Sequence, residues 1–211
     1  MKQPPINIAV MVSGQSRGSN MQAIINGCKD GEINGKVVCV IGVRDSAPAI
    51  ERAKLQNINT LIINPSEYPS QDEYDEKLIS ALSDYNIDLI CLAGYMRPLG
   101  IKIIRTYRNK IMNVHPSLIP SFCGKGMYGH HVHEAAIKRG VKVSGATVHF
   151  VNEEYDEGPI ILQTVVNIDD NDNAETLAAK VLNVEHSTYV KAISLFADNK
   201  LVIIGNKVIF K

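Results

Sequence analysis

The stretch Ile6-Asn7-Ile8-Ala9-Val10-Met11-Val12-Ser13-Gly14-Gln15-Ser16-Arg17-Gly18-Ser19-Asn20 passes from an apolar run into a loop of glycine, serine and polar residues. Such a run, followed by such a loop and then by helical periodicity, is typical of a buried strand that turns into a helix. The free N–H groups at the start of a helix attract anions, so the loop predicts a phosphate site. A tight turn with a Ser or Asn cap explains the same residues equally well.

The loop also narrows the class of ligand. It lacks the Lys of a Walker A loop, and its glycines do not have the spacing of a dinucleotide fingerprint. It therefore favours a phosphorylated metabolite over ATP or NAD.

Further apolar runs recur along the chain, and most are separated by segments with helical periodicity. This alternation predicts an α/β fold with a mostly parallel, twisted open sheet and helices on both faces, Rossmann-like in its N-terminal half. Ser70 and Glu73 have the spacing of a capping box and predict the start of one helix. The apolar runs are Ile6–Val12, Val37–Val43, Thr60–Ile63, Ile87–Leu92, Lys110–His115 and Val143–Phe150.

After Phe150 the pattern changes, because an acidic Gly-Pro segment precedes a long apolar strand at 160–168 and a helix at about 173–197. The runs 201–204 and 208–210 predict a hairpin around Gly205 and Asn206. We expect these elements to extend the same sheet rather than to form a separate domain.

Composition excludes several classes of protein. Among 211 residues, 22 Lys and Arg balance 22 Asp and Glu, which leaves no basic surface for nucleic acid or an anionic membrane. The four cysteines are scattered and form neither a C-x-x-C pair nor a disulfide framework. The first apolar run is too short for the core of a signal peptide. A cytoplasmic protein that acts on small molecules is expected.

Asn113 and His115 stand at the end of one predicted strand, at the edge of the sheet where ligands usually bind. Alternation places both side chains on the same side of the strand. An amide donor beside an imidazole can stabilise the oxyanion of an acyl-transfer intermediate, and the imidazole can exchange protons. A hydrogen-bonded histidine at a strand end is the structural alternative and is favoured for this pair taken alone.

The sequence pattern alone does not assign roles to several acidic and histidine side chains. One carboxylate of the segment 153–157 near His115 would favour the protonated imidazole, but spacing does not say which. Glu185 falls on the apolar stripe of the last helix, where it binds a substrate or lies at the margin of the stripe. His130, His131 and His133 follow a Gly-rich stretch, 122–129, that predicts a mobile loop. We interpret them as exposed loop residues rather than metal ligands, so no metal is predicted.

Taken together, these motifs resemble the phosphoribosylglycinamide formyltransferases, folate-dependent enzymes of purine synthesis, over essentially the whole chain. The resemblance is carried by five segments in the family's order. They are Gly18-Ser19-Asn20, Leu92-Ala93-Gly94-Tyr95-Met96-Arg97, Asn113-Val114-His115-Pro116-Ser117-Leu118-Ile119-Pro120, Gly145-Ala146-Thr147-Val148-His149-Phe150-Val151 and Asp156-Glu157-Gly158-Pro159-Ile160-Ile161.

The resemblance implies a formyltransferase fold in one domain, 1–211, with a ribonucleotide-binding half at about 1–109 and a catalytic and folate-binding half at about 110–211. It implies transfer of a formyl group from 10-formyltetrahydrofolate, a cosubstrate, to the amine of glycinamide ribonucleotide. Nucleic acid, membrane and metal have no part in this reaction, and a homodimer is left open. The implied catalytic residues are Asn113, His115 and Asp156; the ribonucleotide contacts are Gly18, Ser19, Asn20 and Glu185; the folate contacts are Met96, Arg97, Pro98, Leu99, Asn113, Val151, Asn152 and Tyr155.

Three other functions share parts of this pattern. A formyltetrahydrofolate deformylase delivers the formyl group to water, but would need no phosphate loop and tends to carry a further N-terminal domain. A methionyl-tRNA formyltransferase is expected to add an RNA-binding domain and a basic surface. A non-catalytic nucleotide-binding module would not need the Asn, His and Asp together.

Overall fold

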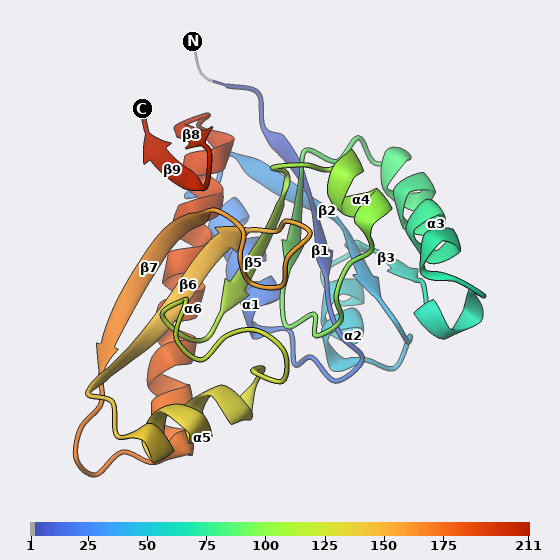
Figure 1. The fold of residues 1–211 in the computed structure, drawn as a ribbon. Helices are drawn as coiled ribbons and strands as arrows, with labels where there is room; N and C mark the ends of the chain where they lie inside the picture. The colour runs from blue at the N-terminus through green and yellow to red at the C-terminus, as the bar shows by residue number, and fades with distance from the viewer. Residues whose placement is uncertain (1–2) are drawn as a thin grey trace.

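One sheet of nine strands runs through residues 3–211, the part of the chain that this computed structural model describes (Figure 1). Its strand order is β3-β2-β1-β4-β5-β6-β7-β9-β8. The strands are β1 (Ile6–Met11), β2 (Gly35–Gly42), β3 (Asn59–Ile62), β4 (Leu89–Leu92), β5 (Ile111–His115), β6 (Val143–Phe150), β7 (Ile160–Asn167), β8 (Leu201–Ile204) and β9 (Lys207–Phe210).

The first five strands pair in parallel, and the direction of the chain along the sheet reverses between β1 and β4. Strand β6 pairs antiparallel with both β5 and β7, β7 pairs in parallel with β9, and β8 and β9 form the predicted antiparallel hairpin at the far edge. A mostly parallel sheet is therefore confirmed, as is its extension after residue 150. A reversal of strand order creates a crevice at the carboxyl ends of the parallel strands, where ligands bind in folds of this kind.

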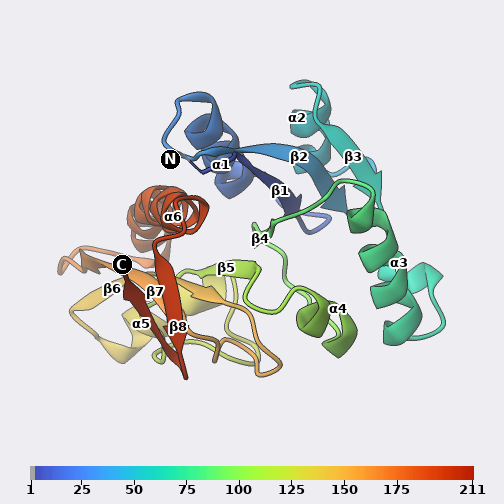
Figure 2. The same cartoon turned by 90° about the horizontal axis from the view of Figure 1, so that it is seen from above.

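Helices cover both faces of the sheet (Figure 2). One face carries α1, α2 and α6, with α5 packed against α6, and their apolar side chains form one buried cluster with the strands. The opposite face carries α3 and α4 over a second cluster. The helices are α1 (Ser19–Lys29), α2 (Pro48–Lys54), α3 (Gln71–Ser83), α4 (Ile101–Thr106), α5 (His130–Arg139) and α6 (Ala174–Ala197), with a short 3-10 turn at Pro65–Glu67.

The helix starts follow local chemistry. Ser70 caps α3 by accepting from the Glu73 backbone N–H, and Asn173 caps α6 in a reciprocal pair with Thr176. Gly18 precedes α1 with φ 76°, a left-handed conformation that suits glycine, and an added Cβ would lie 3.0 Å from the Ala49 side chain. The strand-to-helix turn predicted at 13–20 is thereby confirmed, but the predicted Ser or Asn cap is wrong, because Gly18 takes the cap position and makes no side-chain hydrogen bond.

The histidines that follow residue 129 were predicted to be exposed residues of a loop; His130 and His131 are exposed, but the loop and the exposure of His133 are wrong. They begin α5, where Val132 and Ala136 are buried and Gly140 closes the helix with φ 73°. His133 faces inward with these residues and is only 5% exposed. None of the helices within residues 3–211 is both long and apolar enough to cross a membrane.

Candidate active site

The end of β5 places Asn113 and His115 on one face of the sheet. In the antiparallel pairing with β6, Asn113 lies opposite His149 and His115 lies opposite Thr147. Their neighbours Met112 and Val114 point into the core on the α6 side. The prediction that Asn113 and His115 share a side is confirmed by this alternation.

Asp156 comes to the same place from the loop between β6 and β7. Its backbone has φ 59°, an uncommon conformation for a residue other than glycine, and its side chain is 6% exposed. One carboxylate oxygen, Oδ2, lies 3.7 Å from His115 Nδ1 and accepts the Gly124 N–H at 2.9 Å. Among the acids of 153–157, Asp156 is therefore the one that faces His115.

The two nitrogens of His115 have different surroundings. Nε2 lies 2.9 Å from the carbonyl oxygen of Phe122, which can only accept, so Nε2 carries a proton. Nδ1 faces the Asp156 carboxylate, at a distance that allows strong attraction between charges but no direct hydrogen bond. A proton on Nδ1 would therefore be stabilised by Asp156, and this nitrogen is the one available for proton exchange.

A second histidine, His149, completes the group and was not predicted as a site residue. Its Nδ1–H donates to the Phe150 carbonyl oxygen at 2.9 Å, so Nε2 of the neutral ring accepts from the Asn113 amide at 3.3 Å. Burial lowers the pKa of His149, which favours the neutral ring. Asp156 Oδ1 lies 3.8 Å from His149 Nε2. The register between β5 and β6, which the sequence does not reveal, brings His149 here.

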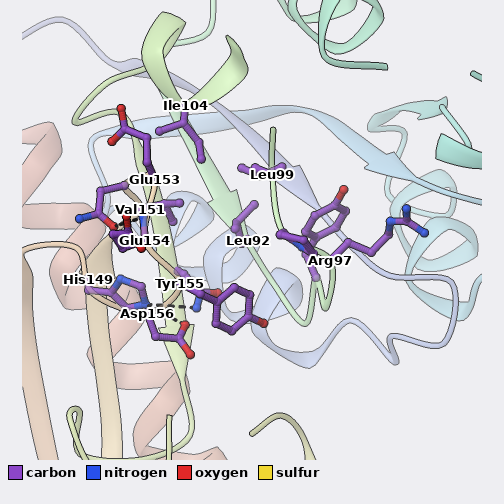
Figure 3. Close-up of a pocket in the computed structure, with 14 residues that line it drawn as sticks. Leu92, Arg97, Leu99, Ile104, His149, Val151, Glu153, Glu154, Tyr155 and Asp156 are labelled. Carbon is purple, nitrogen blue, oxygen red and sulfur yellow. Dashed lines mark hydrogen bonds and ion pairs between the residues drawn. The ribbon is translucent and has the colours of Figure 1, made fainter. Parts of the chain in front are cut away.

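A pocket of about 570 Å³ opens beside this group, and we call it the Leu92 pocket (Figure 3). Leu92, Leu99 and Ile104 form apolar walls, while His149 and Asp156 lie together at one end. The Arg97 side chain extends away from this end in Figure 3. The predicted folate contacts among its lining residues are Arg97, Pro98, Leu99, Asn113, Val151, Asn152 and Tyr155; Met96 instead lines the neighbouring pocket.

The neighbouring pocket spans about 660 Å³, its opening to solvent included, and we call it the Glu185 pocket. Glu185 accepts a hydrogen bond from the Asn20 side-chain N–H at 2.7 Å, and burial raises its pKa to about 7 against that bond. Within residues 3–211 the Asn20 Oδ1 atom has no partner. Glu185 is thus buried rather than marginal, whereas Gly18 and Ser19 lie at the start of α1 outside the pocket wall.

The two pockets meet at residues whose side chains can take part in catalysis. Tyr95, Asn113, Tyr155 and Asp156 line both of them, and His115 lines the Glu185 pocket. A molecule in each pocket would therefore bring its reactive end to Asn113 and Asp156. Over residues 3–211 no three His, Cys, Asp or Glu side chains gather as metal ligands would.

Comparison with known proteins agrees with this geometry. A family model described as "Formyl transferase" matches residues 6–193. The phosphoribosylglycinamide formyltransferase of Escherichia coli is 38% identical over 196 residues, which cover 93% of this chain and 89% of that protein.

The chain belongs to the phosphoribosylglycinamide formyltransferase family.

Other members of the family extend the likeness. The chloroplastic phosphoribosylglycinamide formyltransferase of Arabidopsis thaliana is 37% identical over 92% of this chain, which spans 66% of the plant protein's length. The crystal structure of glycinamide ribonucleotide transformylase 1 from Symbiobacterium toebii matches with a TM-score of 0.91 and 43% identity, covering 98% of this chain and 94% of that one. This formyltransferase therefore shares both sequence and architecture with its family along most of its length.

Proposed function

We propose that this formyltransferase moves the formyl group of 10-formyltetrahydrofolate to the amine of N1-(5-phosphoribosyl)glycinamide in purine biosynthesis. The products are the formylglycinamide ribonucleotide and tetrahydrofolate, so the folate is a cosubstrate. The observation that carries this proposal is the meeting of two pockets at Asn113 and Asp156. A group transfer between two bound molecules needs this arrangement, because the donor and acceptor must touch at the reacting groups.

The chemistry of each pocket suggests its occupant. Apolar walls with a few polar groups suit a pterin ring, so the Leu92 pocket takes the folate. Its Asn113 and Val151 contact the folate near the reacting end, and Tyr155 stands between the two ligands. Met96, on the wall of the other pocket, would contact the folate only where the two ligands meet.

The Glu185 pocket takes the ribonucleotide. The Asn20 and Glu185 side chains offer oxygen acceptors to ribose hydroxyls. The start of α1 at Gly18 and Ser19 holds the phosphate, with N–H groups of the first helical turn as donors, whereas the Gly18 N–H already donates to the Ser16 hydroxyl oxygen at 3.2 Å. Arg17, exposed in the preceding turn, adds a positive charge beside it.

Asn113 stabilises the transition state. The amine attacks the formyl carbon, a C–N bond forms, and negative charge develops on the formyl oxygen. One amide hydrogen of Asn113 is held by His149, so the other is free to donate to this oxyanion. A protonated His115 adds positive charge nearby, and Asp156 stabilises that charge.

His115 and Asp156 then manage the proton. The attacking amine must lose a proton, and the folate nitrogen N10 must gain one as its bond to the formyl carbon breaks. His115 Nδ1, directly or through an ordered water, exchanges that proton, while Nε2 stays bound to the Phe122 carbonyl. No covalent bond to the enzyme is required.

The test is release of tetrahydrofolate from 10-formyltetrahydrofolate, followed with and without glycinamide ribonucleotide. We expect release only when the ribonucleotide is present, and a loss on the order of a hundredfold or more in kcat for His115→Ala. His131→Phe is the control, because His131 is exposed on α5 and pairs with Glu134, and Phe keeps a ring for the edge-on contact with Tyr128.

Two other outcomes would change the assignment. Release to water in the absence of the ribonucleotide would identify a deformylase. Tight binding of both ligands with no release would identify a binding module. Mass spectrometry of the formylated product distinguishes transfer from hydrolysis directly. The division into halves at about residue 110, the cytoplasmic location and a homodimer stay predictions.

A further inference from the structure

His133 lies buried in the wall of the Glu185 pocket, although neither the proposed chemistry nor the predicted contacts use it. It projects from the first turn of α5 and is 5% exposed. In the part of the chain that the structure describes, its Nδ1 is shut off from solvent and has no hydrogen-bond partner. A buried polar atom without a partner destabilises the fold, so packing alone does not account for a histidine at this position.

The protonation of the ring follows from its surroundings. Burial, together with smaller effects of the nearby His130 and His115, lowers the pKa of His133 to about 4, so the ring is neutral at pH 7. A buried N–H without a partner is rarer than a buried lone pair without one. The single proton therefore belongs on Nε2, with the lone pair on the enclosed Nδ1. Nε2 is the nitrogen left to meet a molecule in the pocket, and it meets it as a neutral donor.

The other polar groups of this pocket complement such a donor. Within residues 3–211, Asn20 Oδ1 accepts no hydrogen bond and the Glu185 carboxylate can accept more than the one from Asn20, so both suit the hydroxyl groups of a ligand. A donor in the same wall suits a carbonyl oxygen. The ribonucleotide carries both kinds of group, and its glycinamide carbonyl lies one carbon from the amine that must reach Asn113.

We propose that His133 is a further ribonucleotide-binding residue, whose Nε2–H donates to the carbonyl oxygen of the glycinamide arm. This inference rests on the proposed function. A neutral donor orients the arm without adding a positive charge to the pocket wall that His115 also lines.

The test compares three substitutions of His133 by steady-state kinetics with both substrates. Phe keeps a planar ring and removes the donor, so His133→Phe should raise KM for the ribonucleotide about tenfold, the equivalent of one lost hydrogen bond. KM for 10-formyltetrahydrofolate and kcat should stay within about twofold, because the bond is made equally in the ground and transition states. Gln carries an amide N–H near the position of Nε2, and His133→Gln should recover most of the loss; the shorter side chain of His133→Asn should not.

Controls separate this role from simple packing. His131→Phe, on the exposed side of the same helix, should leave both KM values unchanged. An unchanged ribonucleotide KM in a stably folded His133→Phe overturns the proposal. Equal losses for Phe and Gln, with equal drops in melting temperature, also overturn it, since they indicate packing. Failure of the wild-type enzyme to transfer formyl to the ribonucleotide is a separate result that rejects the proposed function itself.

Discussion

At the scale of single residues, His149 decides which hydrogen of Asn113 faces the substrate. Because His149 Nε2 accepts one amide hydrogen, the Asn113 side chain cannot turn its oxygen toward the oxyanion without losing that bond. His149→Phe removes the acceptor, and misplacement of the amide should lower kcat on the order of a hundredfold. His149→Gln offers an oxygen at a similar reach and should keep more activity. Measuring kcat at saturation by both substrates checks this, and equal losses for Phe and Gln would contradict it.

Glu185 makes the stability of the unliganded enzyme depend on pH. Its pKa is about 7 in the folded chain and 4.5 without burial, so its stabilising contribution is complete below pH 4.5 and is lost as pH rises through 7. Glu185→Gln does not titrate and can still accept from Asn20. Its stability relative to wild type should therefore rise by about 3 kcal/mol between pH 4.5 and pH 8, measured by urea unfolding without ligands. If the free energies of unfolding of variant and wild type differ by the same amount at every pH in this range, Glu185 is not the source of the pH dependence.

At the scale of elements, α4 is anchored by a carboxylate from α3. Asp75 is fully buried and accepts from the Lys102 and Ile103 backbone N–H groups at 3.1 and 3.3 Å. These two bonds fix a helix of only six residues, which carries Ile104 into the Leu92 pocket.

Loss of this anchor should affect one substrate more than the other. Asp75→Ala should raise KM for 10-formyltetrahydrofolate several-fold, roughly the effect of losing a helix cap, and leave KM for the ribonucleotide within about twofold. Asp72→Ala is the matched control, because Asp72 is exposed on the same helix and only pairs with Lys102 among residues 3–211. Equal changes in both KM values would indicate general unfolding instead.

At the scale of the whole molecule, the strand runs and the end of β5 could be predicted because they depend on local alternation. The helix at about 173–197 was predicted from the change of pattern after residue 150, and the trio of Asn113, His115 and Asp156 from the family motif. His149 could not be predicted, since its place opposite Asn113 depends on the antiparallel return of β6, a tertiary choice. His133 was misassigned because the preceding glycines masked a helix. The spacing of Val132 and Ala136 before Gly140 was the available signal.

The two halves of the chain share one core, and we expect them to unfold together. The main cluster combines side chains from β1, α1 and α2 with others from β6 and α6, so neither half buries its apolar surface alone.

Tyr189 of α6 links the halves further, since its hydroxyl lies 3.2 Å from the Leu92 carbonyl of β4 and 2.8 Å from the Met112 carbonyl of β5. Tyr189→Phe should lower the free energy of unfolding by about 1–3 kcal/mol, because these buried carbonyl oxygens would lose the hydroxyl group that donates to them. Urea unfolding followed by far-ultraviolet circular dichroism and by tyrosine fluorescence should give coincident transitions for wild type, shifted together in the variant. Two separated transitions would show instead that the crevice at the carboxyl ends of β4 and β5 divides independent units, and that the catalytic residues are assembled only after the halves dock.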